Sequence, residues 1–367
     1  MRRGVRLFLF GVLACSLMAP QAGAQGAPLS PRAYVANQSG ATVTVIDIAT
    51  NTVVATVDLQ ALGYSATAKP HFTAVEPDGS AWYLTMIGEN KVLKFDRANH
   101  VVGSVSTPVP GLMALDPVHD RLFIGRSMAA VNPPSSITMV RRSDMTLLDD
   151  IDVVVPRPHA ITITPDGNHV YVGSLGSNQM AIVNPDDGTA RLMDIPGPLH
   201  TVVQWAMSPD GRWMAGTGQM TNLLLVYSLA DPDHPALTNQ VQVGHQPWHP
   251  TVSRDGHTVF VPDFADNAVT LVDAGSWTVR RTVTGDVFAQ PHGSASSPDG
   301  KYIYVSNRNT GGEAHDHDGH PDNPMGRVAV LCESTGDIVA TIPAGAYAAG
   351  MNTPTTVGVL PSLPACR

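Results

Sequence analysis

Histidines occur repeatedly at one point of a recurring sequence pattern, directly or closely after a proline. The segments that carry them are Pro70-His71, Pro158-His159, Pro198-Leu199-His200, Pro247-Trp248-His249 and Pro291-His292. Neutral imidazole is the commonest protein ligand for transition metals and can also transfer protons. Five such side chains gathered in one place would therefore suit Zn²⁺ or copper.

Three more histidines are concentrated in a single short segment, residues 313–322. His315, His317 and His320 alternate there with acidic residues. Imidazole together with carboxylate suits Zn²⁺, Cu²⁺ or Ni²⁺, although short His/Asp tracts are often only solvated loops. We expect these three histidines to recruit a metal ion to the first group.

The elements that must position these residues belong to a repeat of about 45 residues. Each unit has an apolar strand, a turn around Pro-Asp-Gly and an aromatic-aliphatic second strand. The second strands are predicted at residues 34–37, 82–85, 122–125, 170–173, 213–216, 259–262 and 303–306. The turns are centred on Asp78, Asp166, Asp210, Asp255 and Asp299, with a degenerate Asp116-Pro117 in the third unit. Such turns form tight hairpins because glycine accepts positive φ.

A third and a fourth strand follow in most units, as in residues 42–46 and 52–57. Four short strands per unit and seven units predict an all-β, seven-bladed β-propeller over residues 25–367. The first unit lacks an inner strand. We expect the C-terminal segment Thr355–Leu360 to supply it, because closing the ring removes two exposed sheet edges.

This architecture predicts where the histidines lie. Inner strands of a propeller run beside the central axis, so equivalent strand starts form a ring around one opening. The loop between second and third strands returns to the same face, which would place residues 313–322 over that ring. The prediction is a metal site at His71, His159, His200, His249 and His292. A polar channel without metal is the alternative, and Met86 and Met220 are further candidates for Cu⁺.

The repeats resemble the YVTN family of β-propellers. The residues that carry the resemblance are Tyr34-Val35-Ala36-Asn37, Ser208-Pro209-Asp210-Gly211 and Tyr304-Val305-Ser306-Asn307. The resemblance covers nearly the whole chain after residue 24 and implies the propeller fold. It does not imply one function, because the family serves binding, structural and enzymatic roles.

Two segments locally resemble the propeller domain of nitrous oxide reductase, which holds a copper-sulfide cluster between histidines. They are Gly197-Pro198-Leu199-His200-Thr201 and Pro291-His292-Gly293. The resemblance implies His200 and His292 as ligands, with the other three ring histidines as positional analogues. The chain has no cupredoxin domain and no Cys/Met/His copper motif, so reduction of nitrous oxide is not expected. The His-rich segment beside a propeller is similar in composition to periplasmic zinc metallochaperones.

The N-terminus predicts export. Arg2, Arg3 and Arg6 surround the start of an apolar run, residues 5–18, that ends before Ala22-Gly23-Ala24. This pattern is typical of a signal peptide covering residues 1–24, and we favour it over a lipoprotein site at Cys15. The chain carries a net charge of −9, and without the signal arginines it carries about −12. We therefore expect a periplasmic or secreted monomer that binds no nucleic acid and does not span the membrane.

Two cysteines, Cys332 and Cys366, lie beyond the predicted signal peptide. An oxidising compartment makes a disulfide between them the expected state, with two free thiols as the alternative.

The sequence thus favours a propeller that binds Zn²⁺ or copper, with a periplasmic protein as a further partner and metal homeostasis as the role. One alternative is a propeller enzyme, a lactonase, lyase or d₁-haem oxidoreductase, with Asp263 and Arg126 available for acid-base work. No nucleophile elbow, CxxCH motif or fixed carboxylate pair supports it. The other alternative is an interaction scaffold.

Overall fold

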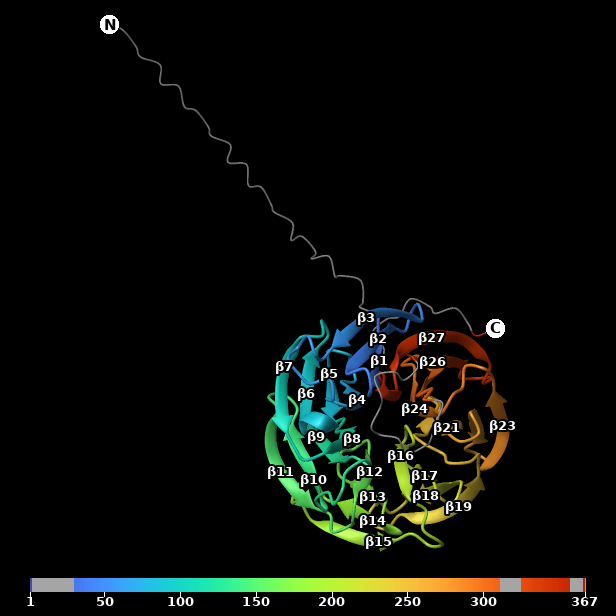
Figure 1. The fold of residues 1–367 in the computed structure, drawn as a ribbon. Coiled ribbons are helices and arrows are strands. Elements are labelled where there is room, and N and C mark those ends of the chain that lie inside the picture. Colours follow the sequence, from blue (N-terminus) through green and yellow to red (C-terminus); the bar gives the residue numbers. More distant parts are fainter. Residues whose placement is uncertain (2–29, 311–324, 357–365, 367) are drawn as a thin grey trace.

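The computed structural model describes Met1, residues 30–310, residues 325–356 and Cys366. Within these residues the chain forms seven four-stranded antiparallel sheets arranged as blades around a central axis (Figure 1). The predicted seven-bladed all-β propeller is therefore confirmed. The predicted signal peptide and the three histidines His315, His317 and His320 lie outside the described residues.

Each blade runs outward from the axis in strand order. The inner strands are β28 (Ala348–Asn352), β4 (Pro70–Val75), β8 (Pro110–Leu115), β12 (Pro158–Ile163), β16 (Val202–Met207), β20 (Thr251–Val252) and β24 (Pro291–Ser296). The second strands are β1 (Arg32–Asn37), β5 (Ala81–Met86), β9 (Arg121–Arg126), β13 (Val170–Ser174), β17 (Trp213–Gly218), β21 (Thr258–Asp263) and β25 (Tyr302–Asn307).

Two further strands complete each blade. The third strands are β2 (Thr42–Asp47), β6 (Lys91–Asp96), β10 (Ser136–Arg141), β14 (Gln179–Val183), β18 (Leu223–Ser228), β22 (Ala268–Asp273) and β26 (Met325–Cys332). The outer strands are β3 (Thr52–Asp58), β7 (Val101–Ser106), β11 (Thr146–Asp152), β15 (Ala190–Asp194), β19 (Ala236–Gln242), β23 (Thr278–Thr284) and β27 (Ile338–Ala346). A 3₁₀ turn, η1 (Ile87–Glu89), connects β5 to β6.

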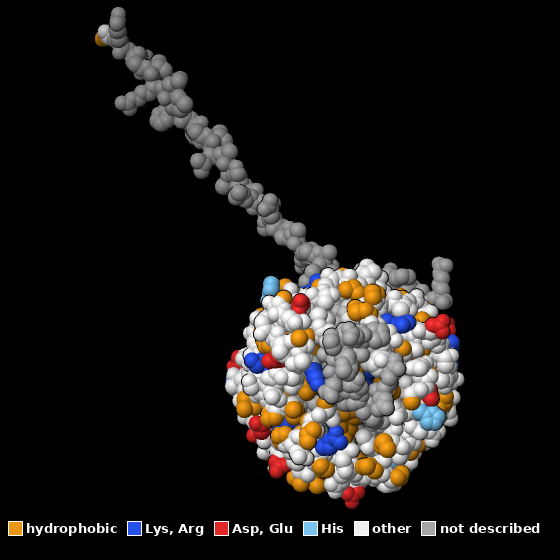
Figure 2. All heavy atoms as spheres, in the orientation of Figure 1, with side chains coloured by type: hydrophobic (Ala, Val, Ile, Leu, Met, Phe, Trp, Pro, Cys, Tyr) orange, Lys and Arg blue, Asp and Glu red, His pale blue; other side chains and the backbone are white. Residues whose placement is uncertain are grey.

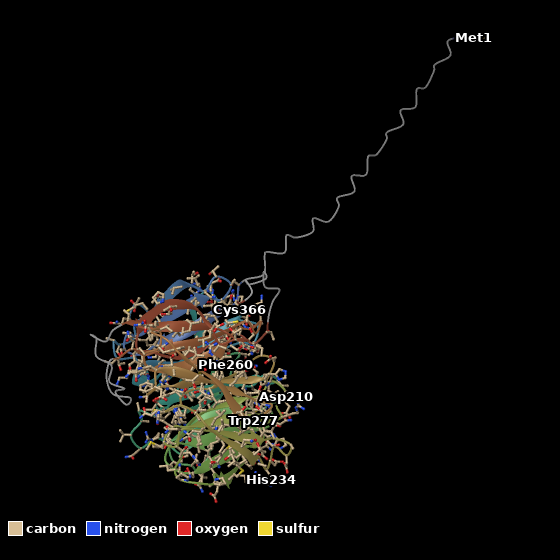
Figure 3. All side chains as sticks on the ribbon, turned by 90° about the vertical axis from the view of Figure 1, so that its right-hand side faces the viewer. Met1, Asp210, His234, Phe260, Trp277 and Cys366 are labelled. Atoms are coloured by element: carbon tan, nitrogen blue, oxygen red, sulfur yellow. The ribbon has the colours of Figure 1, made fainter. Side chains whose placement is uncertain are left out.

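The Pro-Asp-Gly turns connect inner to second strands, as the sequence predicts. Their glycines have positive φ, for example 69° at Gly211, a backbone region that disfavours residues with a Cβ. The aspartate accepts a hydrogen bond from the backbone two residues later, as Asp210 does from the Arg212 amide at 3.1 Å. In the edge-on view of Figure 3, Asp210 lies at one face of the disc. These turns therefore define the face at which the inner strands end.

The ring closes with a different segment from the one predicted. The inner strand of the first blade is β28, which pairs antiparallel with β1, whereas Thr355 and Thr356 belong to no strand and the rest of the expected segment lies outside the described residues. The sequence of β28 is Ala-Ala-Gly-Met-Asn and lacks β-branched residues. Small residues are needed there because a Cβ on Gly350 would meet the His71 carbonyl oxygen at 2.5 Å.

The hydrophobic core lies mainly between neighbouring blades. One cluster joins residues of β4–β7, β8–β11 and β12–β14, and similar clusters join the other blades. Second strands are buried on both faces, whereas outer strands expose most of their residues. Stacked rings strengthen one contact between blades, where the Trp82 ring centre lies 4.0 Å from that of Phe95 and 4.6 Å from that of Tyr34. This packing holds the inner strands in a fixed ring.

Candidate metal-binding site

The start of each inner strand has an unusual backbone that directs the following side chains. Lys69, Arg157 and Gln290 precede a proline and adopt left-handed φ values of 49°, 51° and 58°. The strand register then shifts between the proline and the residues two or three positions later. A β-bulge of this kind re-aims a side chain, and here the shifted residues include His71, His159 and His292. The bulge therefore explains how histidines enter the channel.

Four of the five ring histidines come together in the described structure. The ring centres of His71 and His159 are 6.2 Å apart, and those of His71 and His292 are 6.3 Å apart. His249 completes the cluster, with its ring centre 4.5 Å from that of His292. These four residues come from blades two, four, six and seven, so only closure of the propeller brings them together.

The four histidines are buried, with exposed fractions of 0–3 %. The His71 Nδ1 atom lies 3.1 Å from the Gln38 side-chain oxygen, and the His159 Nδ1 atom lies 2.7 Å from the Arg126 carbonyl oxygen. These contacts place the N–H of each ring on Nδ1 and leave Nε2 with its lone pair. Among the described residues, the His159 Nε2 atom and both ring nitrogens of His249 have no hydrogen-bond partner. Buried polar atoms of this kind call for a ligand or water.

Burial also keeps the imidazoles uncharged. Desolvation lowers the pKa of His159 to about 4, and the same cause, with the charge of Arg308 and the neighbouring His159, lowers the pKa of His249 well below its usual value. A metal ion requires the neutral form of imidazole. At neutral pH these two side chains can therefore bind a metal without first releasing a proton.

The cluster approaches, but does not reach, the geometry of a preformed metal centre. Two imidazoles on one tetrahedral Zn²⁺ have ring centres about 5 Å apart, since the Zn–N bond is about 2 Å. The observed separations of 4.5–6.3 Å bracket this value. Within the part of the chain that the structure describes, no group of three or more His, Cys, Asp or Glu residues is already arranged to hold a metal. Binding therefore requires the longer contacts to close by rotation of the rings.

His200 lies apart from the other four. Its Nδ1 atom is 2.8 Å from the Thr221 hydroxyl and its Nε2 atom is 3.0 Å from the Pro196 carbonyl oxygen, so both ring nitrogens are used locally. The left-handed residue of this blade is Thr201, which makes Val203 the positional equivalent of His71. The extra residues in the Pro-Leu-His segment thus shift His200 out of the ring. Among the described residues it has no ring contact with the other histidines.

Blade six departs from the pattern by one residue. Trp248, not His249, occupies the position equivalent to His71, because Gln246 is the left-handed residue and Pro247 follows it. The Trp248 amide donates to the Pro262 carbonyl oxygen at 2.8 Å, and the His249 amide donates to the His292 carbonyl oxygen at 3.2 Å. The irregular backbone before β20 therefore lets both side chains face the cluster.

An apolar layer lies beside the histidines at the starts of the inner strands. Met128, Leu175, Val203, Trp248 and Phe264 form one buried cluster, contributed by the starts of inner strands and the ends of second strands. Apolar side chains are also spread over the face seen in Figure 2, while acidic side chains lie mostly toward its rim. Trp248 packs against the histidine cluster, with its ring centre 4.4 Å from that of His292.

A buried arginine extends this layer toward blades seven and one. The Arg308 guanidinium carbon lies 4.5 Å from the ring centres of both Trp248 and Tyr347, and the side chain is 1 % exposed. Cation–π contacts of this kind stabilise a desolvated guanidinium. The sequence places Arg308 at the same opening, as a residue at the end of a second strand, but sequence reasoning missed Trp248 and Gln38 as neighbours of the site. The only signal was the Pro-Trp-His triplet at a repeat position that otherwise reads Pro-His.

The channel is open on the opposite side of the histidines. A cavity of about 260 Å³ runs along blade six from His249 to Arg254, and a second cavity of about 240 Å³ adjoins it. Both are lined by Phe72, Gln204 and Asn352. The ring of Phe72 lies 5.9 Å from that of His249, so it forms part of the floor of the cluster.

The residues considered for acid-base chemistry lie in other surroundings. Arg126 donates to Ser136, Thr107 and Pro108, and Asp263 accepts a hydrogen bond from Thr270 at 2.5 Å. Burial raises the pKa of Asp263 to about 7. Neither residue lines the two channel cavities. Of the candidate Cu⁺ ligands, Met86 is buried in the core between blades, and Met220 is 67 % exposed.

The two cysteines are neighbours but are not bonded to each other in the structure. Both are free thiols. Burial, and then the hydrogen bond with Cys332, raises the pKa of Cys366, whereas hydrogen bonds from Cys366 and Ser334 lower the pKa of Cys332 against the opposing effect of burial. Figure 3 shows Cys366 at the edge of the disc. The expected disulfide stays a prediction.

Comparisons with known proteins support the fold. No known family profile and no characterised protein sequence matches the chain. Among solved structures, the chain is similar to Kuenenia stuttgartiensis hydrazine synthase, with 19 % identity, a TM-score of 0.62, and coverage of 76 % of this chain and 88 % of the other. It is also similar to apo AztD from Citrobacter koseri, with 11 % identity, a TM-score of 0.59, and coverage of 89 % and 98 %.

A third similar structure is the periplasmic gluconolactonase PpgL of Pseudomonas aeruginosa. It is 17 % identical, with a TM-score of 0.68, and the match covers 92 % of this chain and all of the other. At these identities the likeness shows a shared propeller architecture and no more. The described part of the chain contains no helix that is long and apolar enough to cross a membrane.

Proposed function

We propose that this chain is an exported propeller that binds one transition-metal ion, Zn²⁺ or copper, between His71, His159, His249 and His292. The observation that carries the proposal is the convergence of four buried imidazoles from four blades, two of them with ring nitrogens that lack a partner among the described residues. Histidine is a ligand that suits both metals. Export is supported by the N-terminal sequence pattern, and a periplasmic propeller occurs among the similar structures.

The metal would be held by the chain's own imidazoles, and the surrounding residues set their state. The Arg126 carbonyl oxygen orients the His159 ring, and the Gln38 side chain orients the His71 ring. Such contacts fix the tautomer of a ligating histidine. The ring of Trp248 excludes water where it packs against His249 and His292. A role in metal homeostasis, with His315, His317 and His320 as a recruiting segment, follows as part of the proposal.

The test is metal titration of untagged protein that has first been stripped with a chelator. We expect one tightly bound Zn²⁺ or copper ion per chain, with X-ray absorption showing imidazole nitrogens at about 2.0–2.1 Å for zinc. A variant with His100→Ala and His234→Ala is the matched control, because these two histidines are exposed and pair with Asp96 and Asp231. It should retain the metal. Absence of stoichiometric metal in the parent protein would contradict the proposal.

The enzyme alternative has its own readout. A d₁-haem or a copper-sulfide centre absorbs visible light, so a coloured protein as isolated would favour an oxidoreductase over a binding protein. Lactonase activity would require acid-base groups in the channel. Of the two groups considered, Asp263 and Arg126, neither lines the two channel cavities.

A further inference from the structure

The channel cavity along blade six differs in chemistry from the histidine cluster. It has a volume of about 260 Å³ and extends from His249 to Arg254. Arg254 is the only charged residue that lines it, and among the described residues no acidic side chain lines either channel cavity. A guanidinium without a facing carboxylate favours an anionic ligand over a cation.

Two neutral side chains in the lining are oriented as donors. The Gln204 Oε1 atom accepts a hydrogen bond from the Ile161 amide at 3.3 Å, and the Asn352 Oδ1 atom accepts one from the Thr353 amide at 2.8 Å. Because a backbone N–H can only donate, these contacts identify the oxygen of each carboxamide. Neither carboxamide nitrogen has a hydrogen-bond partner among the described residues, and neither is fully buried. Both side chains therefore offer N–H groups to the cavity that they line.

The Arg254 guanidinium is anchored and keeps one donor nitrogen available. Its Nε atom donates to the Ser297 carbonyl oxygen at 3.1 Å, and its Nη2 atom donates to the carbonyl oxygens of Ser296 and Pro354, also at 3.1 Å. These bonds fix the plane of the rigid guanidinium and hence the direction of Nη1, which makes no hydrogen bond among the described residues. A donor held in this way binds an anion with little loss of conformational freedom.

The acidic groups near Arg254 make their hydrogen bonds outside the cavity. Glu333 accepts from the Arg254 backbone amide at 3.0 Å and from the Ser296 hydroxyl at 2.6 Å. Asp299 accepts from the Ser297 hydroxyl at 2.7 Å. Burial lowers the pKa of Arg254, and the charges of Glu333 and Asp299 counteract that effect. Neither acid lines the cavity, so they keep the guanidinium charged without facing a ligand.

Apolar side chains form another part of the lining. Phe72, Trp205 and Met351 line the cavity, and their exposed fractions are only 1–6 %. Such a surface binds the hydrocarbon part of a ligand. The cavity volume of about 260 Å³ lies just below the range of about 300–1,000 Å³ that is usual for drug-sized ligands. The matching ligand is therefore small, of about ten non-hydrogen atoms.

The three donors are neighbours in the channel. Asn352 lies two residues before Pro354, whose carbonyl oxygen accepts from Arg254. Gln204 and Asn352 line both cavities and so lie at their junction. One ligand group can therefore meet a charged donor and two neutral donors. A carboxylate suits this arrangement because it accepts several hydrogen bonds and carries the opposite charge.

We propose that this cavity is a binding site for a small organic carboxylate, with the carboxylate at Arg254, Gln204 and Asn352 and the hydrocarbon part against the apolar lining. The site goes beyond the proposed metal function and does not depend on it, because none of the three donors belongs to the histidine cluster.

The first test compares phenylacetate with phenylacetamide, a neutral analogue of the same shape. Each is titrated by NMR into untagged protein that has been stripped of metal and dialysed free of chelator, so that no ion at the histidines contributes. We expect phenylacetate to bind at least about tenfold more tightly. Equal affinities, or no binding of phenylacetate up to about 10 mM, would overturn the proposal. Inorganic phosphate that competes as strongly as phenylacetate would overturn the assignment of an organic ligand.

Gln204→Glu tests the donors directly. It replaces the nitrogen donor by a carboxylate oxygen and keeps the oxygen that accepts from the Ile161 amide. Asn352→Asp makes the same exchange at the second donor. In each variant the new charge would repel the ligand, so phenylacetate should bind at least about tenfold more weakly than to the parent protein.

Gln240→Glu is the matched control, because Gln240 is exposed on the outer strand β19 of the same blade as Gln204 and the change in net charge is identical. This variant should bind phenylacetate like the parent protein. Circular dichroism verifies that each variant is folded. An unchanged affinity in the folded Gln204→Glu or Asn352→Asp protein, or an equal loss in Gln240→Glu, would overturn the assignment of the donors.

Discussion

Replacing His159 and His292 together by alanine separates metal binding from folding stability. These residues come from blades four and seven, and the ring of each lies next to the ring of His71. Two imidazoles would remain, which is too few for the closed tetrahedral coordination of a stable Zn²⁺ site. We therefore expect the double variant to lose the stabilisation that Zn²⁺ gives the parent protein.

The size of this effect follows from linkage. Free Zn²⁺ at a thousand times its Kd stabilises the folded chain by about 4 kcal/mol. Unfolding entropy is about 2.1 cal/mol/K per residue, or about 0.7 kcal/mol/K for about 340 folded residues, so the parent Tm should rise by about 6 °C. In the double variant the same zinc concentration should raise the Tm by less than about 1 °C. Differential scanning calorimetry with and without Zn²⁺ measures both shifts.

His200→Ala is the matched control for losing a buried histidine. Its ring makes two local hydrogen bonds, to Thr221 and to the Pro196 carbonyl. Removing it should destabilise the metal-free protein by about 1–3 kcal/mol, since its partners are left unsatisfied. The increment due to Zn²⁺ should nevertheless stay near the parent value. A double variant that keeps the full increment, or a His200→Ala variant that loses it, would refute the assignment of the site.

Three further outcomes are expected. Asp263→Asn should raise the Tm most at alkaline pH. Burial raises the pKa of Asp263 to about 7, so the carboxyl does not destabilise the folded chain below its unfolded pKa but destabilises it by about 4 kcal/mol once the pH passes 7. An equal change in Tm at pH 5 and pH 9 would argue against this. A disulfide between Cys332 and Cys366 should stabilise the chain by about 4 kcal/mol, since it closes a loop of about 35 residues. Thiol titration and thermal unfolding before and after reduction measure this effect, and an unchanged Tm on reduction would count against the bond. Gly350→Val should destabilise the folded chain by about 2 kcal/mol or more, because a Cβ there would meet a neighbouring carbonyl oxygen at 2.5 Å. The midpoint of urea unfolding measures this effect, and an unchanged midpoint would show that β28 can shift.

Much of the fold could be predicted because short-range sequence patterns define the propeller repeat. Alternating strands and Asp-Gly turns are local features, and seven copies of them reinforce one another. All seven predicted second strands were confirmed. The closing strand was placed too late in the chain because β28 is built from small residues with little strand propensity. Its position is set by the narrow space beside the His71 backbone, which is a tertiary constraint.

The sequence by itself determined the blade architecture and the kinds of side chain that enter the channel. Tertiary structure decided which histidines meet, through the left-handed residue and register shift at each inner strand. His200 lies outside the cluster because its blade begins that strand at Thr201, whereas His249 joins it because the backbone before β20 is irregular. The direction of a side chain at a bulge depends on pairing with a neighbouring strand, and that pairing is fixed only when the ring is closed.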